Sequence, residues 1–127
     1  MVLRMVIHDP EFLQRAAEAK ARVEQLQPHD LEGALEDGAI LIDVREPAEL
    51  AQGSIPGSLN IPLDALPQRI TAVIPDPTAA IVCLCRGGNR SSLAAANLLD
   101  LGYINVRSLA GGLEGLSVAS PPPTQPG

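Results

Sequence analysis

The chain has 127 residues, which is enough for one domain with its own hydrophobic core. Apolar residues make up 46% of it, but Phe12 and Tyr103 are the only aromatic residues, so Leu, Ile, Val and Ala must build the core. The net charge of −6 argues against a nucleic-acid-binding surface. No apolar run approaches the roughly 20 residues of a membrane span. We therefore expect neither nucleic acid nor a membrane among its partners.

The two ends of the chain are expected to lie outside the central domain. Residues 1–9 are apolar, but this run is too short for a secretory signal. The sequence DPE at 9–11 is typical of a helix start, and the helix is predicted to run to about Gln25. Residues 1–26 would thus form a mainly helical extension that packs on the domain, or alternatively an oligomer contact. At the other end, SVASPPPTQPG over residues 117–127 predicts a disordered, proline-rich tail.

Between these ends, strand patterns alternate with helix patterns. Short apolar runs predict strands over residues 39–44, 59–61, 80–84 and 105–109, and helical patterns cover residues 27–38, 47–52, 66–74 and 91–101. This alternation predicts an α/β fold, in which a mostly parallel sheet carries helices on both faces. Ligands of such sheets bind outside the carboxyl ends of the strands. The residues that follow the strands are therefore candidate site residues.

The two cysteines, Cys83 and Cys85, are too close in sequence to join distant segments by a disulfide. The only histidines, His8 and His29, lie far from them, so the chain offers no four-ligand metal site. We expect a reducing compartment, the cytoplasm, and neither a metal nor a cofactor. Cys83 is interpreted as a core thiol, with a resolving thiol as the alternative.

Six residues, CRGGNR, begin at Cys85 and separate a predicted strand from a predicted helix. A loop that closes onto a helix N-terminus points several backbone N–H groups into one small bowl, and the helix dipole adds positive charge there. Gly87 and Gly88 allow positive φ, and Arg86 and Arg90 add two full charges. This surrounding favours a thiolate, so Cys85 is predicted to be a nucleophile in an anion cradle. The alternative is a buried structural thiol, which would not need the glycines and arginines.

Three blocks of sequence are similar, in order, to motifs of the rhodanese-like sulfurtransferases. Residues 85–91, CRGGNRS, resemble the C-x-x-G-x-R-S active-site loop of that family. Residues 41–50 and 53–62, LIDVREPAEL and GSIPGSLNIP, resemble its D-V-R-E-x-x-E and G-H-I-P-G-A-x-N blocks. Residues 109–113, LAGGL, resemble its closing L-x-G-G element. The resemblance covers roughly residues 27–116, which we take as one rhodanese-like domain.

The resemblance implies a rhodanese-like fold with a central sheet of about five strands, and an enzyme that works through a persulfide on Cys85. It implies that the thiol takes a sulfane sulfur from a small donor such as thiosulfate. The persulfide then passes this sulfur to cyanide or to a thiol, with a protein as a further candidate acceptor. No cofactor is implied.

The resemblance also implies roles for the residues around Cys85. The substrate-binding set is the rest of the loop: Arg86, Gly87, Gly88, Asn89, Arg90 and Ser91. Arg86 is expected at the mouth, where it attracts an anionic donor. Arg90 is expected to tie loop carbonyls or to bind the anion. Asn89 and Ser91 are expected to shape the loop, with Ser91 as the helix N-cap.

Asp43 and Arg45 match the D-x-R of the family, which implies that they hold the loop through hydrogen bonds. The alternative for this pair is an ordinary surface ion pair. Glu46 and Glu49 follow in the same block, and the resemblance indicates a role in the site for them less strongly than for Asp43 and Arg45.

A cysteine phosphatase or arsenate reductase is one rival function, because these enzymes use a similar cradle. Their loop follows C-x5-R and is one residue longer, whereas four residues separate Cys85 from Arg90 here. The wider bowl suits a phosphate, and the narrower one suits a single sulfur atom.

A non-catalytic rhodanese-like module for regulation or binding is the second rival. Departures from the family pattern favour it: Ser54 replaces a usual His, and Leu50, Leu113 and Leu116 occupy positions where an aromatic residue is usual. The presence of Cys85 favours the enzyme.

Overall fold

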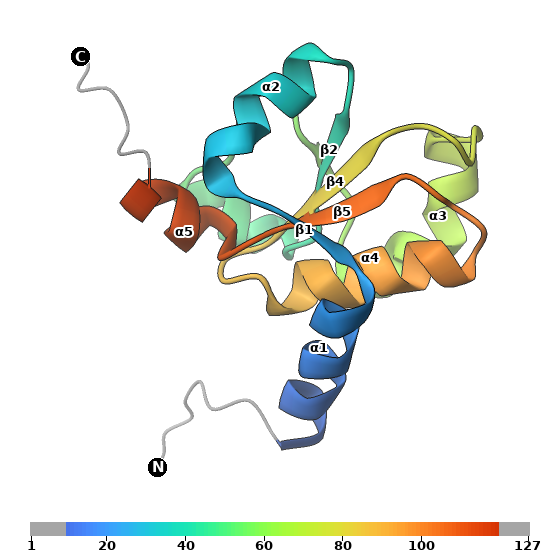
Figure 1. Ribbon diagram of the computed structural model, residues 1–127, viewed down its shortest axis with the longest axis horizontal. Coiled ribbons are helices and arrows are strands. Elements are labelled where there is room, and N and C mark those ends of the chain that lie inside the picture. Colours follow the sequence, from blue (N-terminus) through green and yellow to red (C-terminus); the bar gives the residue numbers. More distant parts are fainter. Residues whose placement is uncertain (1–9, 120–127) are drawn as a thin grey trace.

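The structure is a computed structural model that describes residues 10–119. A five-stranded parallel sheet lies at its centre, in the order β1-β5-β4-β2-β3 (Figure 1). The strands are β1 (Glu24–Leu26), β2 (Ile40–Asp43), β3 (Leu59–Asn60), β4 (Ile81–Leu84) and β5 (Val106–Leu109). The helices are α1 (Pro10–Arg22), α2 (Leu31–Glu36), α3 (Leu66–Val73), α4 (Asn89–Asp100) and α5 (Gly112–Ala119), with 3-10 helices η1 (Pro28–Asp30), η2 (Pro47–Gln52) and η3 (Leu63–Ala65).

Helices cover both faces of the sheet, as the sequence predicted. Successive side chains of a strand point to opposite faces, and β4 shows this clearly. Ile81 and Cys83 belong to the cluster of apolar side chains packed with α1, α3 and α4. Val82 and Leu84 belong to the cluster on the other face, with α2 and α5. In Figure 1, α2 and α5 lie on one side of the sheet, and α1, α3 and α4 lie on the other.

The N-terminal helix is shorter than the sequence predicted. It ends at Arg22 rather than near Gln25, and the next residues form β1, an edge strand that the sequence analysis missed. β1 pairs with β5, and this pairing buries Leu26. Backbone pairing with a distant strand fixes this element, and a strand of three residues has no local pattern that reveals it. The last turn of α1 is joined to α4 by an ion pair between Arg22 and Asp100 at 2.9 Å.

At the other end, α5 continues to Ala119 and so includes the first three residues of the predicted tail. The rest of that tail, and the predicted apolar segment at residues 1–9, lie outside the described residues. Within residues 10–119, no helix is both long enough and apolar enough to cross a membrane.

The carboxyl ends of β2 and β4 bring the candidate site residues to one edge of the sheet. Asp43 pairs with Leu84 in the register of these two strands, so the chain leaves both strands at the same level. Cys85 follows β4, Arg45 follows β2, and the loop after Cys85 leads directly into α4. The fold thus brings together two of the sequence blocks that carried the resemblance.

Candidate active site

The sulfur of Cys85 lies inside the loop that follows it. The backbone N–H groups of Gly88 and Ser91 donate hydrogen bonds to Sγ at 3.1 and 3.3 Å, and Ser91 Oγ lies 3.4 Å from the same atom. The residue is 1% exposed, whereas Arg86 and Gly87, which follow it, are exposed. Donors aimed at one sulfur stabilise negative charge on it. The loop thus surrounds the sulfur with hydrogen-bond donors, which is the geometry that an anion cradle requires.

The conformation of the loop depends on one glycine rather than two. Gly88 has φ of +104°, a conformation that side chains other than glycine rarely adopt, and its position is the N-cap of α4. A Cβ atom there would also lie 3.3 Å from the backbone nitrogen of Gly111. Gly87 does not adopt positive φ. The predicted N-cap, Ser91, lies inside α4, which begins at Asn89.

Three fully buried serines continue the hydrogen bonding behind the sulfur. Ser91 Oγ and Ser108 Oγ are 2.8 Å apart, and Ser92 Oγ lies 3.3 Å from Ser108 Oγ. Ser92 also donates to the carbonyl of Gly88 at 2.8 Å, which ties α4 to the loop. This network gives Ser108 a hydroxyl partner on each side, and it holds the Ser91 hydroxyl beside Cys85.

Arg90 binds Glu49, whereas the sequence analysis expected it to bind loop carbonyls or the substrate anion. Its guanidinium donates to both carboxylate oxygens of Glu49, at 2.7 and 3.0 Å, rather than to loop carbonyls. A two-point contact of this kind fixes orientation as well as charge. Glu49 in turn accepts from the backbone N–H of Glu46 at 3.1 Å. The pair therefore joins the end of the loop to η2.

Acid is expected to weaken this ion pair. Its hydrogen bonds with Arg90 lower the pKa of Glu49 from 4.5 to about 2. Because the folded-state pKa is the lower one, the pair stabilises the fold fully above about pH 5, and this contribution is lost as the pH falls toward 2. We expect Glu49→Gln to lower the free energy of unfolding by about 1–2 kcal/mol at pH 7, a figure reduced for partial exposure of both side chains. Urea unfolding at pH 7 and at pH 3 measures this difference.

The matched control is Glu36→Gln, which removes an exposed carboxylate on α2 and should change stability little at either pH. The gap between Glu49→Gln and the unmutated chain should shrink at pH 3, because the unfolded chain then binds a proton at Glu49 that the folded chain must release. A gap that stays as large at pH 3 as at pH 7 would show that Arg90 does not act through the charge of Glu49.

Asp43 and Arg45 form a buried ion pair, not a surface one. Arg45 Nη2 lies 2.8 Å from Asp43 Oδ2, and both side chains are at most 3% exposed. Hydrogen bonds with Asp43 raise the pKa of Arg45 further. Arg45 gives its other donors to the carbonyls of Glu49 and Gly53, at 3.3 and 2.9 Å. The pair thus holds η2, and its link to the loop after Cys85 runs through Glu49 and Arg90 rather than through direct side-chain hydrogen bonds.

The first turn of α5 packs against the back of the loop that follows Cys85. The N–H of Leu113 donates to the carbonyl of Cys85 at 2.9 Å, and the N–H of Glu114 donates to the carbonyl of Arg86 at 3.0 Å. In a trans peptide, the carbonyl and the next N–H point in opposite directions. The contacts from α5 therefore direct the N–H groups of Arg86 and Gly87 away from α5. A Cβ atom on Gly112 would lie 2.5 Å from both carbonyl oxygens, so only glycine fits there.

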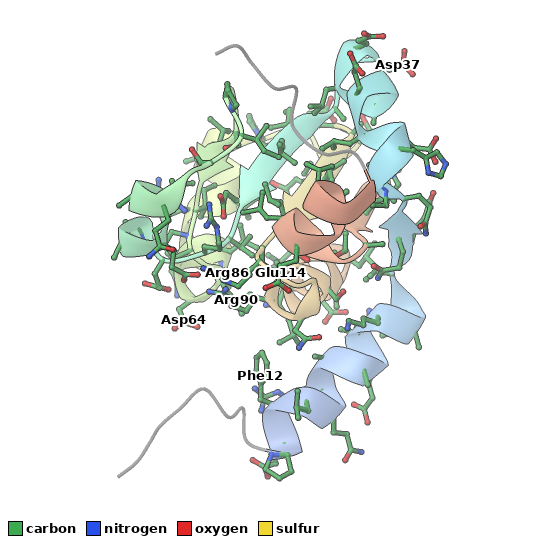
Figure 2. All side chains as sticks on the ribbon, turned by 90° about the vertical axis from the view of Figure 1, so that its left-hand side faces the viewer. Phe12, Asp37, Asp64, Arg86, Arg90 and Glu114 are labelled. Carbon is green, nitrogen blue, oxygen red and sulfur yellow. The ribbon has the colours of Figure 1, made fainter. Side chains whose placement is uncertain are left out.

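The mouth of the loop carries charges of both signs. Arg86 is exposed, as predicted, and Figure 2 shows it beside Glu114. Glu114 Oε1 would lie 3.6 Å from a Cβ atom on Gly87, so this carboxylate sits over the loop. Arg86 and Glu114 also line a groove of about 880 Å³ between α2 and α5. The leucines at 113 and 116, which occupy positions where we expected the family's aromatic residue, form part of its wall.

Cys83 behaves as the sequence predicted for a core thiol. It is fully buried on the same face of β4 as Cys85, and both cysteines are free thiols. Burial raises the pKa of Cys83 to about 12. A thiol in that state does not ionise near neutral pH, so Cys83 is inert toward substrates.

Most of this sequence matches one known family. The profile of the Rhodanese-like domain family matches residues 27–119. The chain belongs to the rhodanese-like family. Among the relatives of this rhodanese-like protein, a sulfurtransferase from Allochromatium vinosum is 38% identical over 90 residues, which cover 67% of this chain and 82% of the relative. A thiosulfate sulfurtransferase from Pseudomonas aeruginosa is 35% identical over 91 residues, which cover 72% of this chain and 81% of the relative.

A solved structure has the same rhodanese-like fold over almost the whole length of both chains. It is a protein of unknown function from Rhodopseudomonas palustris, described as a possible tyrosine phosphatase, with a TM-score of 0.73 and 26% identity. The match covers 96% of this rhodanese-like chain and 98% of that one. The family match and the relatives named as sulfurtransferases support a sulfurtransferase enzyme in general terms, and the solved structure supports the fold.

Sequence reasoning missed several residues of this site. The sequence indicated only a weak role for Glu49, and it did not indicate that Glu49 binds Arg90. Gly111 and Gly112 belong to the LAGGL motif, but the sequence of this motif does not indicate that Gly112 contacts the carbonyl of Cys85. Ser92 and Ser108 carried no signal, because a serine in a helix or a strand does not show which distant hydroxyl it meets.

Proposed function

We propose that this protein is a rhodanese-type sulfurtransferase that moves a sulfane sulfur from a donor such as thiosulfate to a thiophilic acceptor through a Cys85 persulfide. The proposal rests above all on one observation: the N–H groups of Gly88 and Ser91 both point at Cys85 Sγ. A structural thiol needs no such donors, whereas a nucleophile that must carry negative charge does.

In the first half-reaction, the Cys85 thiolate attacks the outer sulfur of thiosulfate. The S–S bond of thiosulfate breaks, and sulfite leaves with the electron pair. Cys85 then carries a persulfide whose terminal sulfur is negative. We propose that this sulfur lies among the loop N–H groups, including those of Arg86 and Gly87, which α5 directs away from itself. Donors placed in advance where charge develops are a major source of catalysis.

In the second half-reaction, an acceptor attacks the terminal sulfur and the Cys85 thiolate leaves. Cyanide would serve in an assay, and a thiol would serve in a cell, either free or on a protein. We assign no general base to Cys85, because the N–H groups of Gly88 and Ser91 already donate to its sulfur. Arg86 is proposed to attract anionic donors, since it is the exposed positive charge next to the nucleophile.

The substrate preference separates this proposal from a phosphatase. The chain should turn over thiosulfate with cyanide, and it should leave an aryl phosphate such as p-nitrophenyl phosphate at the uncatalysed rate. The physical reason is the short loop, in which four residues lie between Cys85 and Arg90 and Arg90 is already bound to both oxygens of Glu49. Thiocyanate and p-nitrophenol are measured in parallel with the same preparation.

The control for this pair of assays is Cys85→Ala, which should lose any activity that belongs to the site. Phosphate release that depends on Cys85, together with no thiocyanate, would favour the phosphatase. No turnover of either substrate and no sulfur bound to Cys85 would favour the non-catalytic module.

A further inference from the structure

The groove between α2 and α5 lies beside the loop, and the two half-reactions leave it unused. Its walls are mostly apolar, and its volume is about 880 Å³. The apolar side chains that line it are Pro28, Leu31, Leu35, Ile55, Leu113 and Leu116. Arg86, the residue next to the nucleophile, lines the same groove. The groove is therefore continuous with the mouth of the catalytic loop.

The size of the groove fits an organic molecule rather than an inorganic donor. Pockets for organic ligands hold about 300–1,000 Å³. Thiosulfate has five heavy atoms and needs space on the order of 100 Å³, if each atom takes somewhat less than the ~30 Å³ of a liquid water. A protein partner would bury about 800 Å² on each side, which is a broader surface than a groove between two short helices. The dimensions thus favour a small organic ligand.

The charges of the groove favour an uncharged body with an anionic end. Glu32 and Glu114 line it, and their carboxylates repel an anion placed along the apolar walls. Arg45 also lines it, but its charge is already paired with Asp43 at 2.8 Å. Arg86 is then the positive charge near the nucleophile that a thiolate end can approach. Figure 2 shows Arg86 and Glu114 together at this mouth.

We propose that this groove is the acceptor subsite, and that the acceptor is a low-molecular-weight organic thiol with an uncharged, apolar body. This inference rests on the proposed function for its chemistry, but binding in the groove can be measured without turnover. The apolar body lies between α2 and α5, and the sulfur end lies near Arg86.

The transfer step needs no further reagent. The acceptor thiol loses its proton to solvent, and its thiolate attacks the terminal sulfur of the Cys85 persulfide. A new S–S bond forms on the acceptor, the bond between the terminal sulfur and Cys85 Sγ breaks, and the electron pair returns to Cys85. The products are an organic persulfide and the free enzyme thiolate, so no external oxidant or reductant is consumed.

Two thiols that differ only in their apolar body test the proposal. N-acetylcysteamine and N-octanoylcysteamine carry the same reacting group and no net charge. The chain is first loaded with thiosulfate and freed of excess donor, and the rate of persulfide loss is then followed by intact mass. We expect the second-order rate constant to be at least tenfold higher for the octanoyl compound. The rate with cyanide, which needs no groove, sets the reference.

Leu35→Glu places a carboxylate in the groove wall on α2, away from the loop, and should abolish the tenfold preference while leaving the cyanide rate unchanged. The matched control is Leu13→Glu, which alters a half-exposed leucine on α1 and should keep the preference. Leu35→Met, which preserves the apolar wall, should also keep it. Equal rates for the two thiols, or a preference that survives Leu35→Glu, would overturn the proposal.

A binding measurement keeps the proposal falsifiable if no persulfide forms. N-octanoylcysteamine is titrated by calorimetry into Cys85→Ala, where no sulfur can be transferred. We expect a Kd at least tenfold lower than for N-acetylcysteamine, and this difference should disappear when Leu35→Glu is added. Absence of that difference would overturn the groove assignment, whereas its presence without persulfide formation would contradict only the proposed function. An apolar cysteine peptide that outcompetes N-octanoylcysteamine would overturn the commitment to a small thiol.

Discussion

Replacing Cys85 with alanine is expected to reduce sulfur transfer from thiosulfate to the uncatalysed background, a loss of at least about a thousandfold. No other group of the described site can form the persulfide, because Cys83 is fully buried and its pKa is raised to about 12. Thiocyanate production in the thiosulfate and cyanide assay measures the loss. The fold should survive, since the change removes one sulfur atom and leaves the backbone of the loop in place.

The matched control is Cys83→Ala, two residues earlier on the same face of β4. It removes an equally buried sulfur from the core, and it should cost about 1 kcal/mol of stability while activity remains within a few-fold. Circular dichroism and thermal unfolding of both variants separate loss of the nucleophile from loss of the fold. Activity that persists in Cys85→Ala but disappears in Cys83→Ala would show that Cys83, and not Cys85, is the nucleophile.

The second large effect is expected from Gly112→Ala, far from the loop in sequence. A Cβ atom at this position would lie 2.5 Å from the carbonyl oxygens of Cys85 and Arg86, and φ is +59°. The clash is with backbone, so α5 and the loop must separate. We expect a loss of about 2–4 kcal/mol in the free energy of unfolding and at least a tenfold loss of kcat at a temperature where the variant is folded. Urea unfolding and steady-state kinetics measure the two effects.

Gly102→Ala separates backbone strain from the clash. Gly102 has φ of +103°, and a Cβ atom there would meet no heavy atom within 4 Å. This control should lose about 1–2 kcal/mol of stability and keep its kcat. If both variants keep full activity, α5 does not orient the loop. Equal losses of activity in both would indicate that general destabilisation is responsible.

The fold could be predicted in outline because its signals are local. The apolar runs at β2 and β4 identify buried strands, and Gly102 stops the preceding helix close to where the structure ends it, at Asp100. β1 could not be predicted in this way. Its register is set by β5, more than 80 residues away, and that pairing leaves no periodic pattern in three residues.

In the candidate site, too, some features have local sequence signals and others depend on distant residues. The place of Cys85 at the end of β4, its loop donors and the exposed position of Arg86 all follow from the sequence of one strand, loop and helix. The partners that act across the fold do not. Arg90 binds Glu49, 41 residues away, and Gly112 meets the carbonyls of the loop only because β5 ends beside β4. Such contacts depend on tertiary packing, which short motifs do not encode.

The most direct test of the central claim is the intact mass of the unmutated chain after incubation with thiosulfate and removal of the excess donor. The account predicts an addition of about 32 Da, one sulfur atom, on Cys85 alone, released as thiocyanate when cyanide is added. Peptide mapping under non-reducing conditions locates the added sulfur. An unchanged mass, or added sulfur that remains in Cys85→Ala, would contradict the account.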